Sequence, residues 1–180
     1  MSKKIILLAG PTASGKSKLA IGLAKKLNGE IINADSMQIF KEFKILSSRP
    51  SLNDTQKIRH HLYGFISVKR YFSAGDWLNE ARKKVDFCLK RKKIPIFVGG
   101  TGLYFNTITK GISKIPNIDL KTRNKVRSLH TKLGYKKFYN LLIKLDPKIK
   151  GKILPTDSQR VQRAYEVKLK TKKSMLDWFA

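Results

Sequence analysis

Acidic side chains are scarce in this chain. Its 180 residues include 12 Asp and Glu against 39 Lys and Arg, which gives a formal net charge of +27. Such an excess predicts a polyanionic partner such as nucleic acid. It also has a compositional explanation, because Lys, Ile and Asn are abundant throughout the sequence. Charge alone therefore favours nucleic-acid binding without establishing it.

Cysteine is nearly absent, and long apolar runs are absent. The single cysteine, Cys88, has no partner for an internal disulfide, and its helical spacing with Trp77 and Ala81 predicts a small core residue. No apolar run approaches the roughly 20 residues that a membrane span needs, and Lys3-Lys4 lead directly into an apolar segment. We therefore expect a soluble, cytoplasmic protein that does not contact a membrane.

The most informative segment is a phosphate-binding pattern. It reads Gly10-Pro11-Thr12-Ala13-Ser14-Gly15-Lys16-Ser17 and matches G-x-x-x-x-G-K-[ST] in full. Gly10 and Gly15 permit the backbone to turn its N–H groups toward phosphate oxygens. Lys16 supplies a positive charge for the terminal phosphates, and the Ser17 hydroxyl is a ligand for Mg²⁺. The pattern predicts a bound di- or triphosphate, as in ATP-binding and other nucleotide-binding proteins.

The segments around this loop have the structure that the motif requires. Residues 5–9 form an apolar run that is typical of a buried parallel strand. Leu19, Leu23 and Leu27 then recur at a spacing of four, as on one face of an amphipathic helix, and Gly29 is expected to end that helix. A glycine-rich turn that binds nothing is therefore the weaker interpretation.

Two further apolar runs predict strands, at residues 30–35 and 94–98. Asp35 ends the first run and is expected at the carboxyl edge of the sheet, near the phosphate loop. A helix from Ser73 to about Arg91, with Ser73 as its N-cap, separates the two runs. Residues 36–72 are irregular in pattern and receive no assignment. Strands alternating with helices predict an α/β fold with a parallel sheet.

The character of the chain changes after residue 112. Lysine-rich amphipathic helices are expected at residues 119–133, 136–145 and 157–170. We predict a P-loop NTPase-like parallel sheet core over residues 1–112, the start of a helical insertion or appendage over 113–156, and a helix over 157–180 that returns toward the core.

One acidic residue stands out near the phosphate loop. Phosphoryl-transfer enzymes with such a loop usually carry an acid after a later strand, where it holds the water shell of Mg²⁺, but Gly99-Gly100 follow the run at 94–98. Asp35 is the available carboxylate. It is interpreted as a ligand of the metal's water shell, a general base, or a helix cap with Ser36. Its place at a sheet edge favours chemistry over capping.

A basic cluster lies near the end of the chain. If Asp157 is an N-cap, Gln159, Arg160 and Arg163 fall on one helix face. Arginine and glutamine suit RNA phosphates and base edges. A solvated basic face explains the pattern equally well.

His60 and His61 form the other notable pair. Adjacent residues rarely ligate one metal ion, and no third ligand is evident in the sequence. Metal binding by this pair is therefore not predicted.

Four motifs in this order together resemble the tRNA dimethylallyltransferases, also called isopentenyl-tRNA transferases. They are residues 10–17, Asp35-Ser36-Met37-Gln38, Gly99-Gly100-Thr101-Gly102-Leu103-Tyr104, and Asp157-Ser158-Gln159-Arg160-Val161-Gln162-Arg163-Ala164. The resemblance covers nearly the whole chain and is far more specific than the phosphate loop alone. Members of that family continue well past the equivalent of Ala180, so this chain resembles a C-terminally truncated member.

The resemblance implies a prenyl transfer. Dimethylallyl diphosphate, the co-substrate, gives its five-carbon group to N6 of adenosine 37, beside the anticodon of tRNA, and diphosphate is released. The phosphate loop then holds a leaving group, with Mg²⁺ as cofactor. The partner is the anticodon stem-loop of tRNA, and we expect a monomer.

The resemblance also implies roles for individual residues. Asp35, Thr12 and Thr101 match catalytic positions: Asp35 takes a proton from the adenine amine or aligns it, and Thr12 lies near the bridging oxygen of the diphosphate. The implied tRNA contacts are Asp35, Ser36, Met37, Gln38, Thr101, Arg123, Gln159, Arg160, Val161, Gln162 and Arg163. Two alternatives remain open: a small-molecule or nucleoside kinase that uses ATP at the same loop, and an inactive RNA-binding fragment.

Overall fold

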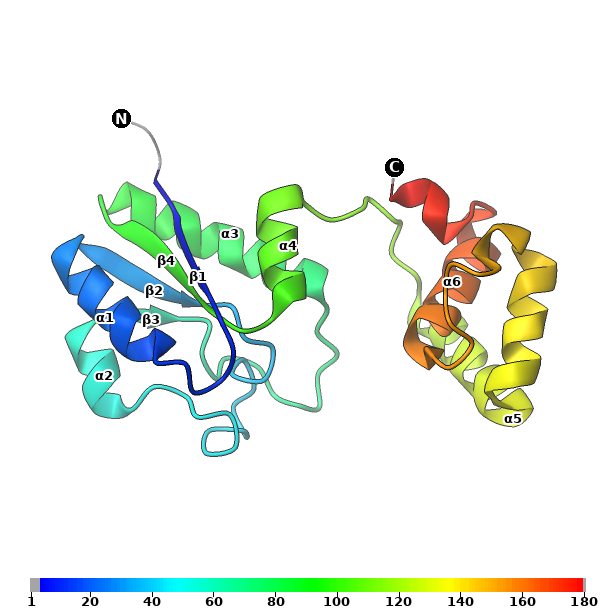
Figure 1. Ribbon diagram of the computed structural model, residues 1–180, viewed down its shortest axis with the longest axis horizontal. Helices are drawn as coiled ribbons and strands as arrows, with labels where there is room; N and C mark the ends of the chain where they lie inside the picture. The colour runs from blue at the N-terminus through cyan, green and yellow to red at the C-terminus, as the bar shows by residue number, and fades with distance from the viewer. Residues whose placement is uncertain (1–3, 180) are drawn as a thin grey trace. The chain divides into compact units, whose positions relative to one another are not determined.

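The computed structural model describes residues 4–179, except for the side chain of Leu52 (Figure 1). The chain divides into two compact units, Met1–Ile112 and Ser113–Ala180. Among the described residues, no helix is both long enough and apolar enough to cross a membrane.

The first unit is built on a parallel sheet. Its strands are β1 (Ile6–Ala9), β2 (Gly29–Asn33), β3 (His60–His61) and β4 (Ile94–Gly99). They pair in the order β1-β4-β2-β3, and every pair is parallel. The predicted parallel α/β core is therefore confirmed.

Helices cover both faces of this sheet. α1 (Lys16–Lys26) covers one face, and α3 (Ala74–Lys90) and α4 (Gly102–Lys110) cover the other. A short helix, α2 (Leu52–Lys57), precedes β3 in the chain. Successive strand residues point to opposite faces. Ile31 accordingly packs in a cluster with Ala20 of α1, whereas Ile32 packs in a second cluster with Trp77 of α3 and Tyr104 of α4. This layering leaves the carboxyl edge of the sheet to the loops.

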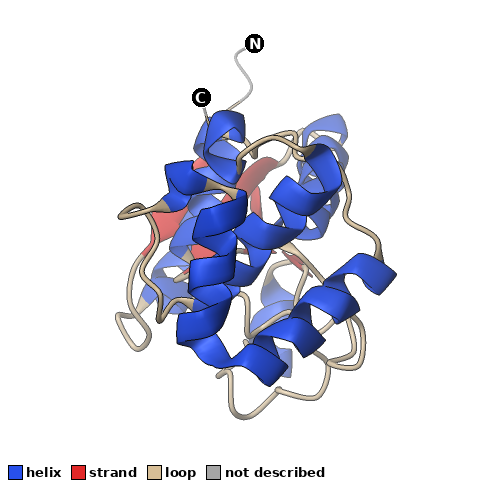
Figure 2. Cartoon of the chain, turned by 90° about the vertical axis from the view of Figure 1, so that its right-hand side faces the viewer, coloured by secondary structure: helices blue, strands red, loops and turns tan. Residues whose placement is uncertain are grey.

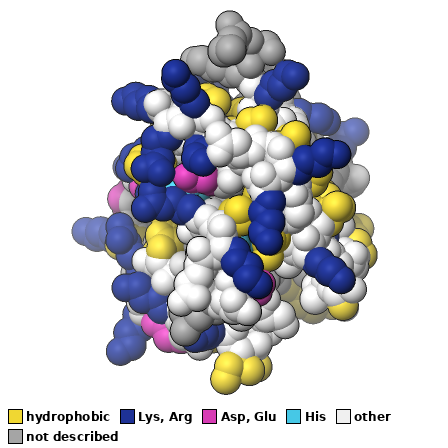
Figure 3. Space-filling model, turned by 90° about the vertical axis from the view of Figure 1, so that its left-hand side faces the viewer, with side chains coloured by type: hydrophobic (Ala, Val, Ile, Leu, Met, Phe, Trp, Pro, Cys, Tyr) yellow, Lys and Arg dark blue, Asp and Glu magenta, His cyan; other side chains and the backbone are white. Residues whose placement is uncertain are grey.

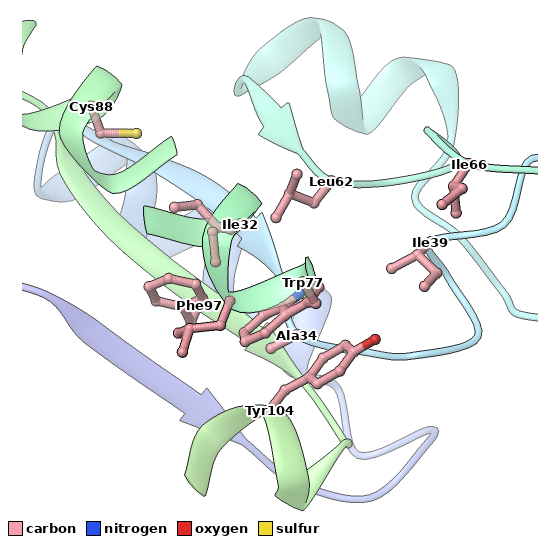
Figure 4. Packing of buried hydrophobic residues seen from close by; sticks show 11 residues of the cluster. Ile32, Ala34, Ile39, Leu62, Ile66, Trp77, Cys88, Phe97 and Tyr104 are labelled. Atoms are coloured by element: carbon pink, nitrogen blue, oxygen red, sulfur yellow. The ribbon is translucent and has the colours of Figure 1, made fainter. Parts of the chain in front are cut away.

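Trp77 joins α3 to the end of β2 (Figure 4). Its side chain has no exposed surface and is stacked on Tyr104, with ring centroids 4.0 Å apart. Its Nε1 donates to the backbone oxygen of Asn33 at 3.1 Å. The predicted N-cap of this helix is also present, because Ser73 Oγ accepts from the Asp76 N–H at 3.2 Å. Core packing and capping thus fix α3 beside the strand that precedes Asp35.

Two elements lie within residues 36–72, which the sequence analysis leaves without an assignment. They are α2 and β3. A capping box of Ser51 and Asp54 begins α2, and this signal is visible in the sequence. β3 has only two residues and is positioned by its pairing with β2, so local periodicity does not reveal it.

The exposure of β1 and the end of α1 differ from the sequence prediction. β1 is one of the two edge strands of the described sheet, and its Leu7 is 39% exposed, so it is not a fully buried strand. Gly29 begins β2 rather than ending α1, and Asn28 adopts the left-handed backbone at this turn, with φ 53°. The order of strands depends on distant contacts, which an apolar run does not encode.

The second unit consists of helices and loops in its described residues (Figures 1 and 2). Its elements are α5 (Leu120–Leu145), the short 3-10 helices η1 (Pro147–Ile149) and η2 (Met175–Trp178), and α6 (Ser158–Thr171). Gly134, with φ 70° and ψ 166°, divides α5 into the two predicted helices. Phe138, Leu142 and Val161 are completely buried in the core of this unit.

Candidate functional site

A cavity of about 400 Å³ lies in the first unit, where the carboxyl ends of its strands meet the phosphate loop. Its lining consists of Thr12, Ala13, Ser14, Gly15, Lys16, Ser17, Lys18, Asp35, Gln38, Ser47, Ser48, Tyr63, Val98 and Gly99. Ligands of open parallel sheets bind at this edge. The structure thus brings the phosphate loop and Asp35 together, as the sequence predicts.

The backbone of the phosphate loop is suited to anion binding. Ala13 and Gly15 have left-handed conformations, with φ 63° and 80°, and Gly15 is the N-cap of α1. The first turn of α1 contains no acidic residue, so the positive end of the helix dipole is not neutralised there. Lys16 Nζ donates to the Pro11 carbonyl and, at 3.3 Å, to Ser14 Oγ. The ammonium group is therefore held over the loop itself.

Asp35 is held in place by Asn33, a residue that the sequence analysis did not identify. Asn33 is completely buried, and its Oδ1 accepts from the Asp35 N–H at 2.9 Å. Its Nδ2 donates to the backbone oxygens of Asp35 and Leu62, at 2.9 and 3.1 Å. The Met37 N–H donates to Asp35 Oδ1 at 2.9 Å. The carboxylate is thus oriented by fixed backbone bonds, with one oxygen engaged.

Thr101 joins the loops that follow β2 and β4. Its Oγ1 accepts from the Ser36 N–H at 2.9 Å and donates to Ser36 Oγ at 3.2 Å. The loops also approach closely: a Cβ at Gly99 would lie 2.1 Å from the Ala34 oxygen. Only glycine fits this position. The glycine at position 99 therefore allows the backbone of β4 to lie against the backbone of Ala34, beside Asp35.

Two tyrosine hydroxyls lie in the electrostatic field of Asp35. Burial, and then the negative charge of Asp35, raises the pKa of Tyr104 to about 12. The same causes, in the same order, raise the pKa of Tyr63 well above its usual value. Both phenols therefore remain protonated at neutral pH and can act as hydrogen-bond donors. Tyr63 lines the cavity, but its pattern in the sequence is that of an ordinary core aromatic.

Gln38, which lines the cavity, is hydrogen-bonded to the loop that contains Ser47 and Ser48. Its Nε2 donates to the backbone oxygens of Ser47 and Ser48, at 2.8 and 3.4 Å. Both serines line the cavity with Gln38. The sequence offers no local signal for this contact, because it depends on the loop conformation that brings Ser47 and Ser48 next to Gln38.

The predicted basic face is present in the second unit. Asp157 is the N-cap of α6, and its Oδ1 accepts from the Arg160 N–H at 3.1 Å. Gln159, Arg160 and Arg163 line one cavity of about 430 Å³, together with apolar side chains such as Leu176. The side chains share the helix face that the spacing predicts.

The remaining predicted tRNA residues of this unit differ in exposure. Val161 is completely buried, so its side chain supports α6 from within the core. Arg163 is half-buried and pairs with Glu166 at 3.3 Å, whereas the Arg160 side chain is 75% exposed and pairs with Asp157 at 3.3 Å. Arg123 lies in the first turn of α5 and is half-buried.

Comparison with known proteins finds close relatives over nearly the whole chain. A tRNA dimethylallyltransferase of Pelagibacter ubique is 58% identical over 177 residues, which is 98% of this chain and 56% of the relative. A tRNA dimethylallyltransferase of Rickettsia bellii is 45% identical over 98% of this chain and 56% of its own length. The chain therefore spans about half the length of the curated relatives it matches.

Comparison with solved structures also finds similarity to enzymes of this kind, again over part of their length. A crystal structure of a eukaryotic dimethylallyltransferase acting on tRNA has a TM-score of 0.83 and 35% identity, over 99% of this chain and 44% of that one. A tRNA isopentenylpyrophosphate transferase of Bacillus halodurans has a TM-score of 0.62 and 32% identity, over 97% and 57% of the two chains. The P-loop NTPase-like fold is thereby confirmed. Residues 38–180 also match the family model for IPP transferase, and the chain belongs to the IPP transferase family.

Proposed function

We propose that the protein of this chain transfers the dimethylallyl group of dimethylallyl diphosphate to N6 of adenosine 37 in tRNA. The observation that carries the proposal is the cavity shared by the phosphate loop and Asp35. The phosphate loop in this cavity is suited to binding a diphosphate, and the Asp35 carboxylate is suited to accepting a proton from an amine. The names of the relatives, tRNA dimethylallyltransferases, support this choice of donor and acceptor.

The phosphate loop would bind the leaving group. As the bond between N6 and the first carbon of the prenyl group forms, the bond from that carbon to the bridging oxygen breaks, and its electron pair leaves with the diphosphate. Lys16 and the loop N–H groups would stabilise this added negative charge. Thr12, on the same loop, lines the cavity and is assigned to the bridging oxygen.

Asp35 would act on the acceptor amine. An exocyclic adenine amine is a weak nucleophile, and it must lose a proton when the new C–N bond forms. Asp35 Oδ1 already accepts the Met37 N–H, so Oδ2 is assigned as the acceptor of that proton. Asn33, which holds the backbone of Asp35 on both sides, acts as a positioning residue.

The site residues fit Mg²⁺, which we propose as the cofactor. The Ser17 hydroxyl lines the cavity beside the phosphate loop, and it is a hard oxygen ligand of the kind that Mg²⁺ prefers. Bound there, the ion would supply further charge neutralisation for the diphosphate.

The tRNA contacts are assigned to both units. Ser36, Met37, Gln38 and Thr101 follow the strands beside the cavity, and a base must leave its stack to reach them. The proposed contacts in the second unit are Arg123, Gln159, Arg160, Val161, Gln162 and Arg163, with Val161 acting through the helix core. The net charge of +27 supports binding to the anticodon stem-loop. Lys and Arg also outnumber acidic side chains on the face drawn in Figure 3.

The test is a labelling experiment with this chain. It is incubated with radiolabelled dimethylallyl diphosphate, Mg²⁺ and unmodified tRNA whose anticodon ends in A. We expect label on adenosine 37 and release of one diphosphate for each group transferred. Asp35→Asn should slow labelling by about 10²- to 10⁴-fold while diphosphate still binds. Glu80→Gln, which alters an exposed carboxylate paired with Lys83, should leave labelling unchanged.

Two results would contradict the proposal. Hydrolysis of ATP that depends on a small hydroxyl acceptor and not on tRNA would favour a kinase. Absence of label despite measurable binding of both diphosphate and tRNA would favour an RNA-binding fragment without activity.

A further inference from the structure

We propose that Glu30, His61 and Cys88 form a buried binding site for a zinc ion in the first unit. The three residues come from β2, β3 and the last turn of α3. None of them lines the cavity that holds the phosphate loop and Asp35. The site is therefore separate from the one assigned to prenyl transfer, and it does not depend on that assignment.

The spacing of the three ligand atoms fits a zinc ion. Glu30 Oε2 and His61 Nε2 are 2.7 Å apart, and Cys88 Sγ lies 3.6 Å from the oxygen and 3.9 Å from the nitrogen. A point equidistant from these atoms lies about 2.0 Å from each, which is the length of Zn–N and Zn–O bonds. Zn–S bonds are about 2.3 Å long. For tetrahedral coordination, Glu30 Oε2 and His61 Nε2 would also have to separate by about half an ångström from their hydrogen-bonded distance of 2.7 Å, with the ion lying out of the plane of the three atoms.

The three side chains are also unusually well buried for polar groups. Glu30, His61 and Cys88 are 4%, 9% and 0% exposed. Figure 4 shows Cys88 at one end of the apolar cluster, away from Trp77 and Tyr104. The polar atoms of Glu30, His61 and Cys88 meet one another at 2.7–3.9 Å, and a shared metal ion would replace these hydrogen bonds with three metal–ligand bonds.

Outer residues orient the carboxylate and the imidazole. Arg91 Nε lies 3.7 Å from Glu30 Oε1, the oxygen that the proposed ion does not use. The ring of Phe87 packs edge-on to His61, with centroids 5.7 Å apart, and the Arg91 guanidinium lies over the same ring. Such second-layer contacts fix metal ligands in their binding orientation.

The donor types favour zinc over Mg²⁺ and Ca²⁺. A thiolate, an imidazole and a carboxylate form a mixed soft and borderline set that suits Zn²⁺ or Co²⁺ and excludes Mg²⁺ and Ca²⁺, which prefer oxygen. Binding would release the Cys88 thiol proton to solvent and place the His61 proton on Nδ1. The charges of one thiolate and one carboxylate then balance the dication. Three protein ligands leave the fourth tetrahedral position to water.

His60 takes no part in this group, although it is adjacent to His61. Its Nδ1 lies 2.7 Å from the Ile58 backbone oxygen, and alternation along β3 directs it to the other face of the sheet. The pair seen in the sequence is thus divided, and His61 obtains its co-ligands from positions 31 and 27 residues away. His60 provides a matched control.

The experiment is a titration of the metal-free chain with Co²⁺, at saturating Mg²⁺ to occupy the phosphate site. Cys88 is the single cysteine, so a sulfur-to-cobalt charge-transfer band in the near ultraviolet can arise from it alone. We expect this band to saturate at one Co²⁺ per chain, with visible bands of tetrahedral coordination. One equivalent of Zn²⁺ should remove both and raise the melting temperature.

Variants separate a metal site from a hydrogen-bonded network. Cys88→Ser should abolish the charge-transfer band, Glu30→Gln should weaken Co²⁺ binding at least tenfold, and His60→Gln should leave both unchanged. Absence of the band in the unmodified chain would overturn the proposal, and that result does not depend on whether a variant folds. Equal Co²⁺ affinity in folded Cys88→Ser would also overturn it, because the three groups would then be only hydrogen-bonded.

Discussion

The two units present their functional groups in different ways. In the first, loops at the sheet edge fix Asp35 through Asn33 and hold Thr101 against Ser36 with bonds of 2.9 Å. In the second, Arg160 projects from a helix with its side chain 75% exposed. Residues 113–180 also carry 18 of the 39 Lys and Arg residues but only five of the 12 acids. The first arrangement suits chemistry at a defined atom, and the second suits attraction of a polyanion.

The largest effect is expected from Asp35→Asn in the first unit. General-base catalysis contributes about 10²- to 10⁴-fold to a rate, so the rate of prenyl transfer should fall by that factor. Binding of tRNA should change little, because the amide keeps the shape of the carboxylate. Single-turnover kinetics and filter binding measure the two quantities. Equal losses in both would show that Asp35 contributes to tRNA binding instead.

Matched core substitutions test whether the units are separate in stability. Trp77 and Phe138 are completely buried in different clusters. Replacing either with Ala should lower the free energy of unfolding of its own unit by about 3–5 kcal/mol, through lost contacts and a cavity. Hydrogen exchange, read separately over residues 4–112 and 113–179, measures the effect. Loss of protection in both units from either substitution would contradict the separation.

Arg160→Ala should produce a moderate effect on tRNA binding. Removal of one phosphate contact is expected to reduce the slope of log affinity against log salt concentration by about 1. Arg163 is less suitable, since its loss would leave the buried Glu166 without its partner. Lys148→Ala, which removes a lysine paired with Asp177 at 2.8 Å, is the control. An equal change in slope for both variants would indicate general attraction without a defined contact.

The smallest effect concerns the acid stability of the second unit. The Thr122 backbone N–H, and then Lys170, lower the pKa of Asp119, so the folded state favours its charged form. This stabilising contribution is present above the unfolded pKa of about 3.9 and is lost as pH falls toward the folded value. Thermal melting at pH 5 and pH 3 should show the loss, and Asp119→Asn should reduce it. An unchanged pH dependence in that variant would assign the effect to other carboxylates.

Much of the first unit was predictable because its signals are local. The phosphate loop, the strand before it and the capping box at Ser73 each depend on neighbouring residues. The position of Asp35 followed from the rule that parallel strands present their carboxyl ends at one edge. The two helices around Gly134 were likewise encoded in a periodic pattern that ends at glycine.

The unpredicted features depend on partners far apart in the sequence. Asn33 has a role because its amide reaches Leu62, 29 residues away. The edge position of β1 and the pairing of β3 follow from strand order, which apolar runs do not specify. The same holds for His61, because its proposed co-ligands, Glu30 and Cys88, come close to it only when β2, β3 and α3 are assembled.

The most direct test of the account compares Asp35→Asn and Arg160→Ala in single-turnover prenyl transfer at increasing tRNA concentration. The predicted result is a crossed pattern. Asp35→Asn should lower the maximal rate without changing the tRNA concentration at half-maximum, and Arg160→Ala should raise that concentration while the maximal rate is retained. If both variants change the same parameter, chemistry and tRNA binding are not divided between the cavity of the first unit and the basic face of the second.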